Sequence, residues 1–327
     1  MKRLLALAVA TTAIFANAQT FPGTKPVTFV VPFAAGGPTD RVARDLAEAM
    51  RKTIPGSNFV VENVNGAGGT IGAAKVARAA PDGHTLLLHH IGMAAAPGLY
   101  RKLPYKVLED FEFLGMINEV PMTIIGKPQL TANNYRDLEN YIKANSGKLN
   151  IAHAGLGSAS HLCGLMWQSA INAKEAMTTI PFGGTAPAMN ALVGGQVDMM
   201  CDQTTNTTGQ IEAGRVKAYA VTTTKPLSGN KLLKDYPTLQ EMGLKGFDLT
   251  IWHGLYAPKG TPPAVLTQLN NAMKVALKDA EFIKKQEGLG AVVVTDRRVE
   301  PAAHKAFVSA EINKLKPVID AAGKYAD

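Results

Sequence analysis

The segment Pro32-Phe33-Ala34-Ala35-Gly36-Gly37-Pro38-Thr39-Asp40 joins a predicted buried strand to a predicted helix. The strand, at residues 27–31, is a β-branched apolar run, and the helix has apolar residues at helical spacing. Pro38 suits the first helical position, and Gly36 and Gly37 let a ligand approach the backbone closely. The first N–H groups of the helix lack helical partners and lie at the positive end of its dipole. The segment is therefore predicted to bind an anion.

The N-terminus has the three parts of a secretory signal peptide. Lys2-Arg3 is a short basic region, an apolar run covers residues 4–15, and Ala16-Asn17-Ala18 is an A-x-A cleavage site. The alternative is a buried N-terminal helix. We expect cleavage near Ala18 and a periplasmic mature protein. The apolar run is too short to span a bilayer, so we do not expect membrane insertion.

The chain is basic, with a formal net charge of +8 at pH 7. Removal of Lys2 and Arg3 leaves +6 (8 − 2). The charges are scattered and aromatic residues are sparse, so a nucleic-acid partner is not expected. A positive field favours the capture of small anions.

The length and the element order predict two lobes. A mature chain of about 309 residues (327 − 18) exceeds the size at which one core stops growing. Strands and helices alternate almost throughout, which indicates an α/β fold. We expect a two-lobed binding protein in which each lobe is a mainly parallel sheet flanked by helices. The predicted division, with a leader at residues 1–18, assigns residues 19–122 and 251–327 to lobe 1 and residues 123–250 to lobe 2.

Two further loops repeat the design of the first. Gly155-Leu156-Gly157-Ser158-Ala159-Ser160-His161 follows a predicted strand and begins a helix, which Ser158 or Ser160 is expected to cap. The turn at residues 181–187 leads into another helix, with Thr185 as its expected N-cap. The sequence therefore predicts three helix starts that favour an anion.

The chain has two cysteines, Cys163 and Cys201. Two are too few for a disulfide scaffold, but an oxidising compartment permits one bridge. Two buried free thiols are the alternative, and the sequence leaves both open.

Several ordered blocks resemble one known family. The chain is similar to the periplasmic solute receptors of tripartite tricarboxylate transporters, the Bug family, over essentially its whole mature length. The resemblance is carried by Pro32 to Asp40, Val61-Glu62-Asn63 with Gly66-Ala67-Gly68-Gly69, Ala80-Pro81-Asp82-Gly83-His84-Thr85-Leu86-Leu87, Leu103-Pro104-Tyr105, Gly194-Gly195-Gln196-Val197-Asp198 and Ala257-Pro258-Lys259-Gly260-Thr261-Pro262.

The resemblance implies a receptor of the Venus flytrap type without catalytic activity or cofactor. Its two lobes would close over a carboxylate and deliver it to the membrane permease subunits of the transporter, and we expect it to act as a monomer. Asp202 matches an acidic position that can face the cleft and order the site. Carried onto this sequence, the other site residues are Phe33, Ala34, Ala35, Gly36 and Thr39 from lobe 1, and Ser158, Ser160, His161, Gly183, Gly184 and Thr185 from lobe 2.

Three histidines depart from the family pattern and complete the set of candidate site residues. His89 and His90 stand where small hydroxyl residues are expected, and His253 stands where an aromatic residue is commoner. Imidazole can bond to or stack on a planar ligand. This favours an aromatic dicarboxylate such as terephthalate over the alternatives, which are an aliphatic di- or tricarboxylate or an acidic amino acid.

Enzyme and metal-binding classes have weaker support. Gly66-x-Gly68 and Gly155-x-Gly157 both lack the third glycine of a dinucleotide fingerprint. Ser158 lacks the nucleophile elbow of a hydrolase, which leaves an exported hydrolase as a remote alternative. The four residues that could meet a soft metal do not have a recognised spacing; they are His89, His90, His161 and Cys163.

Overall fold

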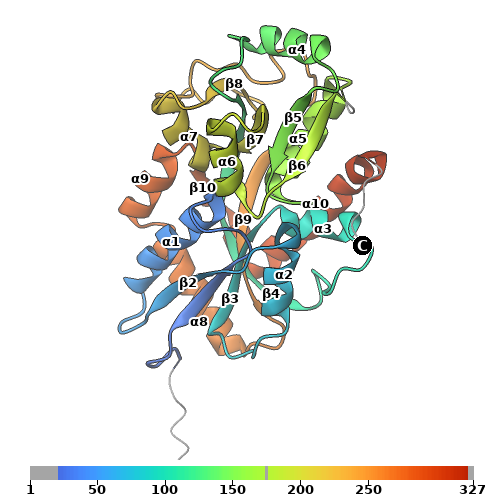
Figure 1. Ribbon diagram of the computed structural model, residues 1–327. Helices are drawn as coiled ribbons and strands as arrows, with labels where there is room; N and C mark the ends of the chain where they lie inside the picture. Colours follow the sequence, from blue (N-terminus) through green and yellow to red (C-terminus); the bar gives the residue numbers. More distant parts are fainter. Residues whose placement is uncertain (1–20, 174–175, 323–327) are drawn as a thin grey trace, which may run out of the picture.

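The computed structural model describes residues 21–173 and 176–322. Two α/β lobes lie one above the other, with β9 near the centre (Figure 1). The predicted leader, residues 1–18, lies outside the described residues. None of the helices described is both long enough and apolar enough to cross a membrane.

The lower lobe in Figure 1 contains both ends of the described chain, and we call it lobe 1. Its N-terminal elements are β1 (Val27–Val31), α1 (Pro38–Arg51), β2 (Phe59–Asn63), the short 3-10 helix η1 (Ala67–Gly69), α2 (Thr70–Ala77), β3 (Thr85–His90) and α3 (Gly92–Leu99). Its C-terminal elements are α8 (Pro263–Ala276), α9 (Ala280–Gly288), β10 (Val292–Val293), η2 (Arg297–Val299) and α10 (Pro301–Ala322).

The upper lobe, lobe 2, is formed by the middle of the chain. Its elements are α4 (Tyr135–Ala144), β5 (Leu149–His153), α5 (Ala159–Ala170), β6 (Met177–Pro181), α6 (Thr185–Val193), β7 (Met199–Gln203), α7 (Thr204–Glu212) and β8 (Lys217–Val221).

Two long strands join the lobes, β4 (Phe111–Gly126) and β9 (Thr250–Pro258). The sheet order is β2-β1-β3-β9-β4-β7-β5-β6, and β8 and β10 also pair with β4. Pairs β1–β2, β1–β3, β5–β6 and β5–β7 are parallel, whereas β4 and β9 run antiparallel to their neighbours. The α/β fold with a mainly parallel sheet in each lobe is confirmed.

The pairing of β4 changes partner along its length. Residues up to Pro121 pair with β9, and residues from Met122 pair with β7. The predicted division near residues 122 and 250 stays a prediction, which this change of partner supports.

Candidate functional site

The loop before α1 is held by an acidic side chain. Gly36 has a φ of +79°, which an L side chain rarely adopts, and its N–H donates to Asp40 Oδ2 at 2.9 Å. Asp40 also accepts from Arg44 at 2.9 Å and from Asn63 at 2.9 Å. Although burial opposes this, the bonds from Arg44, Gly36 and Asn63 hold the pKa of Asp40 below its ordinary value. The N–H of Gly36 is therefore already paired within the loop and is not one of the amides open to an anion.

The amides available to a ligand lie one step further along α1. Pro38 is the first helical residue, as predicted, and Gly37 is the N-cap. The first helical hydrogen bond runs from Arg41 N–H to Gly37 O at 3.1 Å. The N–H groups of Thr39 and Asp40 precede that bond and can donate to an anion.

Phe33 covers the two histidines at the end of β3. Its ring stacks on His90, with centroids 4.6 Å apart, and meets His89 edge-on at 5.5 Å. His89 Nδ1 accepts from His90 N–H at 2.8 Å, and His90 Nδ1 accepts from Gly92 N–H at 2.9 Å. Burial lowers the pKa of His90 to about 3 and that of His89 well below its ordinary value. Both rings are therefore neutral at pH 7, with their remaining proton on Nε2.

His253 and Thr39 lie in direct contact in lobe 1. Thr39 Oγ1 is 3.2 Å from His253 Nε2, and His253 Nδ1 is 2.9 Å from Asn118 Oδ1. The His253 ring is fully buried and lies 5.9 Å from the ring of His90. Burial and the neighbouring His90 hold the pKa of His253 well below its ordinary value.

The loop before α5 uses its two serines to order itself. Ser158 is the N-cap and accepts from His161 N–H at 3.2 Å, as expected, while Ser160 Oγ accepts from Ala154 N–H at 2.9 Å. The two hydroxyl oxygens lie 3.2 Å apart, so one hydroxyl donates to the other. The pair therefore keeps one hydroxyl hydrogen that a ligand can accept.

The turn before α6 differs from its prediction. Gly184 is the N-cap, with no side-chain hydrogen bond, and Thr185 is the first helical residue. The expectation that Thr185 caps the helix is wrong, because the extended Gly184 (φ 168°) already occupies that position. The Thr185 side chain is buried against the α1 loop instead, since a Cβ added to Gly37 would lie 2.9 Å from Thr185 Oγ1.

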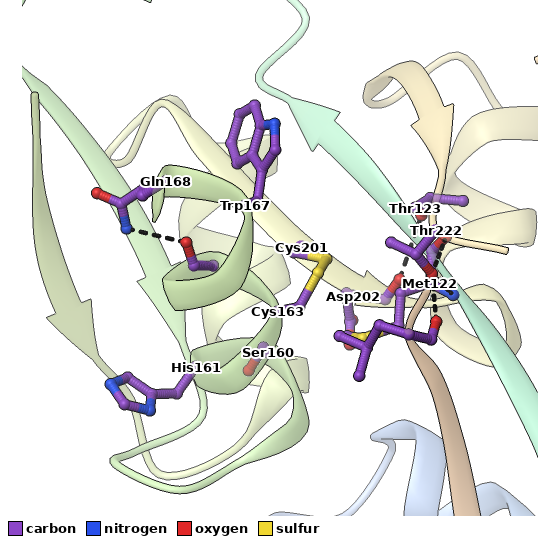
Figure 2. Close-up of a disulfide and its surroundings, with 12 residues drawn as sticks. Met122, Thr123, Ser160, His161, Cys163, Trp167, Gln168, Cys201, Asp202 and Thr222 are labelled. Atoms are coloured by element: carbon purple, nitrogen blue, oxygen red, sulfur yellow. Dashed lines mark hydrogen bonds between the residues drawn. A yellow bond between two sulfur atoms is a disulfide. The ribbon is translucent and has the colours of Figure 1, made fainter. Parts of the chain in front are cut away.

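A disulfide connects α5 and β7, two of the elements that carry candidate site residues of lobe 2. Cys163 in the first half of α5 is bonded to Cys201 in β7, which settles the alternative that the sequence left open. Figure 2 shows the bridge between the start of α5, with Ser160 and His161, and the end of β7, with Asp202. The bridge also removes Cys163 as a metal ligand. Within the described parts of the chain, no three His, Cys, Asp or Glu side chains are grouped as metal ligands would be.

Asp202 is fully buried at the end of β7. Its Oδ2 accepts from Asn206 at 2.5 Å, and its Oδ1 has no hydrogen-bond partner within residues 21–173 and 176–322. Burial raises the pKa of Asp202 to about 7, against the opposing effect of the bonds from Asn206 and the Gln203 backbone. Asp202 can therefore accept from a ligand when ionised and donate to one when protonated.

The polar residues that follow Asp202 were not predicted as site residues. Gln203 Oε1, Thr204 Oγ1 and Thr205 Oγ1 are buried and make no hydrogen bond to the part of the chain that the structure describes. The signal that could have found them is the run of hydroxyl residues after a buried strand, at the same kind of strand-to-helix junction as the three predicted loops. Thr204 lies where the lobes meet, because a Cβ added to Gly290 of lobe 1 would lie 3.2 Å from its Oγ1.

The two lobes are closed on each other. A Cβ added to Gly184 would lie 2.8 Å from the backbone nitrogen of Ala34, so these predicted site loops touch. On another side of the cleft, the Tyr100 hydroxyl of lobe 1 is 2.7 Å from Leu156 O of lobe 2. The structure therefore brings the α1 loop against the α6 loop, and the η1 region against the α5 loop. Phe33, His89 and His90 form one cluster in lobe 1, and Thr39 and His253 a contact beside it.

A cavity of about 600 Å³ lies between α5, residues 243–247 and the end of α10. It shares Ser160 and His161 with the candidate site. None of the lobe 1 loop residues or Asp202 lines it. We therefore place the candidate site at the contact between the loops and not in this cavity.

Comparison with known proteins shows the family to which this chain belongs. The model of the tripartite tricarboxylate transporter family receptor matches residues 42–324, and the chain belongs to that family. A relative from Agrobacterium vitis, the UPF0065 protein in the TAR-I ttuE-ttuC' intergenic region, is 47% identical over 309 residues, covering 94% of this chain and 88% of the relative.

Two solved structures are similar to this chain in both sequence and fold. The periplasmic binding protein BugD is 49% identical, with a TM-score of 0.88 over 92% of this chain and 99% of that one. MatC from Rhodopseudomonas palustris, solved with bound malate, is 39% identical, with a TM-score of 0.84 over 90% of this chain and 98% of that one. The predicted resemblance to the Bug receptors is confirmed.

Proposed function

We propose that this protein is a periplasmic receptor that captures a dicarboxylate between its closing lobes and delivers it to a tripartite tricarboxylate permease. The observation that carries the proposal is the contact between the α1 loop of lobe 1 and the α6 loop of lobe 2, two of the loops predicted to bind the ligand. The α1 amides of Thr39 and Asp40 would hold one carboxylate, and the free hydroxyl hydrogen of the Ser158–Ser160 pair would contribute from lobe 2.

The family and the solved neighbours are solute-binding proteins, which supports a binding role without a reaction. The buried histidines are neutral and engaged with the protein. His253 contacts Thr39 and Asn118, and His90 is stacked under Phe33. The sequence favoured an aromatic dicarboxylate such as terephthalate. Malate in MatC favours an aliphatic dicarboxylate instead, so the aromatic acid becomes the second candidate.

The proposal is tested by identifying the ligand directly. Native mass spectrometry of protein purified without denaturation is expected to detect a retained small acid. A thermal-shift panel of aliphatic and aromatic mono- and dicarboxylates is expected to include at least one acid that raises the melting temperature, because a ligand that binds only the folded state stabilises it. If no carboxylate stabilises the protein, the proposed function is wrong.

A further inference from the structure

A continuous chain of buried polar side chains runs from the cleft end of α1 through the interior of lobe 1. Thr39 contacts His253, and His253 contacts Asn118. Asn118 Nδ2 donates to Gln286 Oε1 at 2.8 Å, and Gln286 Nε2 donates to Asp45 Oδ2 at 2.7 Å. The four side chains before Asp45 are each at least 98% buried. The chain crosses β9, β4 and α9 and returns to α1.

The carboxylate of Asp45 sets the direction of every hydrogen bond in this chain. An ionised carboxylate can only accept, so Gln286 must present its NH₂ to Asp45 and its oxygen to Asn118. Asn118 must then present its NH₂ to Gln286 and its oxygen to His253. Burial raises the pKa of Asp45, and the nearby Lys285 and Arg41 oppose that effect.

The tautomer of His253 follows from the oxygen that faces it. Asn118 Oδ1 requires a hydrogen on His253 Nδ1. A neutral imidazole carries one N–H, so Nε2 of His253 has a lone pair and accepts from Thr39. The hydroxyl hydrogen of Thr39 is thereby committed to His253 at 3.2 Å. Thr39 can offer a ligand only the acceptor side of its hydroxyl oxygen.

We infer that Thr39, held by His253, selects a dicarboxylate that carries a hydroxyl group next to its carboxylate. This inference rests on the proposed function. The Thr39 amide lies in the first turn of α1, where it can donate to the carboxylate, and the Thr39 hydroxyl oxygen on the same residue accepts from the adjacent hydroxyl. A bare carboxylate placed against Thr39 Oγ1 would bring two acceptors together, which is unfavourable.

Asp202 gives independent support from lobe 2. Its Oδ1 is buried without a partner among the described residues, and above pH 7 it is an acceptor. Thr39 Oγ1 in lobe 1 and Asp202 Oδ1 in lobe 2 are therefore two acceptors that need a donor. A ligand with only carboxylate oxygens offers neither of them a donor, whereas the hydrogen of one hydroxyl group can pair with one of them.

The test measures ligand preference by calorimetric titration at pH 8 with pairs that differ by one hydroxyl group. The pairs are L-malate and succinate, 2-hydroxyglutarate and glutarate, and 2-hydroxyterephthalate and terephthalate. For a pair that binds, the wild-type Kd for the hydroxylated acid is expected to be at least about tenfold lower than the Kd for the unsubstituted acid. A tenfold difference in Kd corresponds to about 1.4 kcal/mol. Thr39→Val keeps the shape and removes the acceptor, so the ratio is expected to fall to near one.

Three further variants separate the inference from a general loss of structure. Thr39→Ser keeps the hydroxyl and is expected to keep the ratio. His253→Phe releases the Thr39 hydrogen, so the unsubstituted acid is expected to gain affinity relative to its partner. Thr261→Val removes a buried hydroxyl bonded to Pro258 O, away from the α1 loop, and is expected to keep the wild-type ratio.

Each outcome has a distinct meaning. A wild-type ratio near one or below one, or a ratio unchanged in Thr39→Val, overturns the inference and leaves the receptor function standing. If no pair binds and no other carboxylate binds, the proposed function fails and this inference fails with it.

Discussion

At the scale of single residues, a substitution at Gly184 can disturb the contact between the lobes without disturbing folding. Its backbone is extended, so alanine is compatible with its conformation. An added methyl group would overlap Ala34 of the other lobe only when the lobes are closed. A substitution of Gly184 by alanine should therefore affect lobe closure and leave the stability of each lobe unchanged.

We expect Gly184→Ala to weaken ligand binding and to leave folding intact. Overpacking costs about 1–3 kcal/mol, which corresponds to a rise in Kd of roughly 5- to 150-fold. Calorimetric titration measures the loss, and the melting temperature of the ligand-free protein reports folding. Gly209→Ala, where an added Cβ meets nothing within 4 Å, is the matched control and should bind as the wild type does. Wild-type affinity in Gly184→Ala would show that the lobes need not meet here.

The free energy of unfolding is expected to fall as pH rises, because the pKa of Asp202 is raised in the folded protein. Its pKa is about 7 in the folded protein, against an ordinary value of 3.8 for an aspartate carboxyl. The folded state therefore binds more protons between about pH 4 and pH 7, and stability falls with pH by up to about 1.4 kcal/mol per unit.

The matching variant is Asp202→Asn, which cannot ionise. Its unfolding free energy, measured by chemical denaturation, should rise relative to the wild type from pH 4 to pH 7 and stay level above pH 7. Asp248→Asn, at an exposed position, should show no such trend. A difference between Asp202→Asn and wild type that is independent of pH would contradict the raised pKa.

At the scale of elements, the disulfide holds α5 against β7. Cys163 and Cys201 are 38 residues apart in sequence. In the chain-entropy account, a bridge over a loop of that length stabilises by about 4 kcal/mol. It also fixes the distance between the Ser158 loop and Asp202, which both belong to the candidate site.

We expect the double variant Cys163→Ala/Cys201→Ala to lose about 4 kcal/mol of unfolding free energy. Denaturation with and without reductant checks this, because reductant should destabilise the wild type and leave the double variant unchanged. Equal stability of the oxidised wild type and the double variant would mean that packing alone holds α5 on β7.

Strongly periodic elements could be predicted from the sequence, and irregular ones could not. The sequence predicts helices at residues 135–144 and 301–322, and the observed α4 and α10 have these bounds. It also predicts a helix that ends at Ala80 after the glycine-rich residues 66–72, whereas α2 ends at Ala77. The helix α7 was missed because its threonine-rich start has weak helix propensity and no apolar period. The first half of β4 was missed because register shifts at Gly115 and Asn118 interrupt its pattern.

Only those parts of the candidate site that are formed by residues close in sequence could be predicted. The three loops could be recognised because glycine, serine and proline mark strand-to-helix turns. The hydrogen bonds from His253 to Asn118 and from Asn118 to Gln286 could not be predicted. These residues are distant in sequence, and only the pairing of β4 with β9 and the packing of α9 bring them together. The bond from Gly36 N–H to Asp40 could not be predicted either, because it is a contact with a side chain within the loop.

At the scale of the whole molecule, the two connecting strands make closure a motion of one lobe against the other. A few residues where β4 changes partner can absorb the change in backbone angles. Ligand contacts from both lobes favour the closed state by their difference in affinity for the two states. The lobes should therefore be open more often without ligand than with it.

Small-angle X-ray scattering tests the central claim, closure over a carboxylate, most directly. The wild-type radius of gyration is measured with and without a saturating dicarboxylate that the thermal-shift panel has identified. The account predicts a smaller radius with the ligand in the wild type and in Gly209→Ala, and a reduced change in Gly184→Ala. An identical radius with and without bound ligand in the wild type would contradict it.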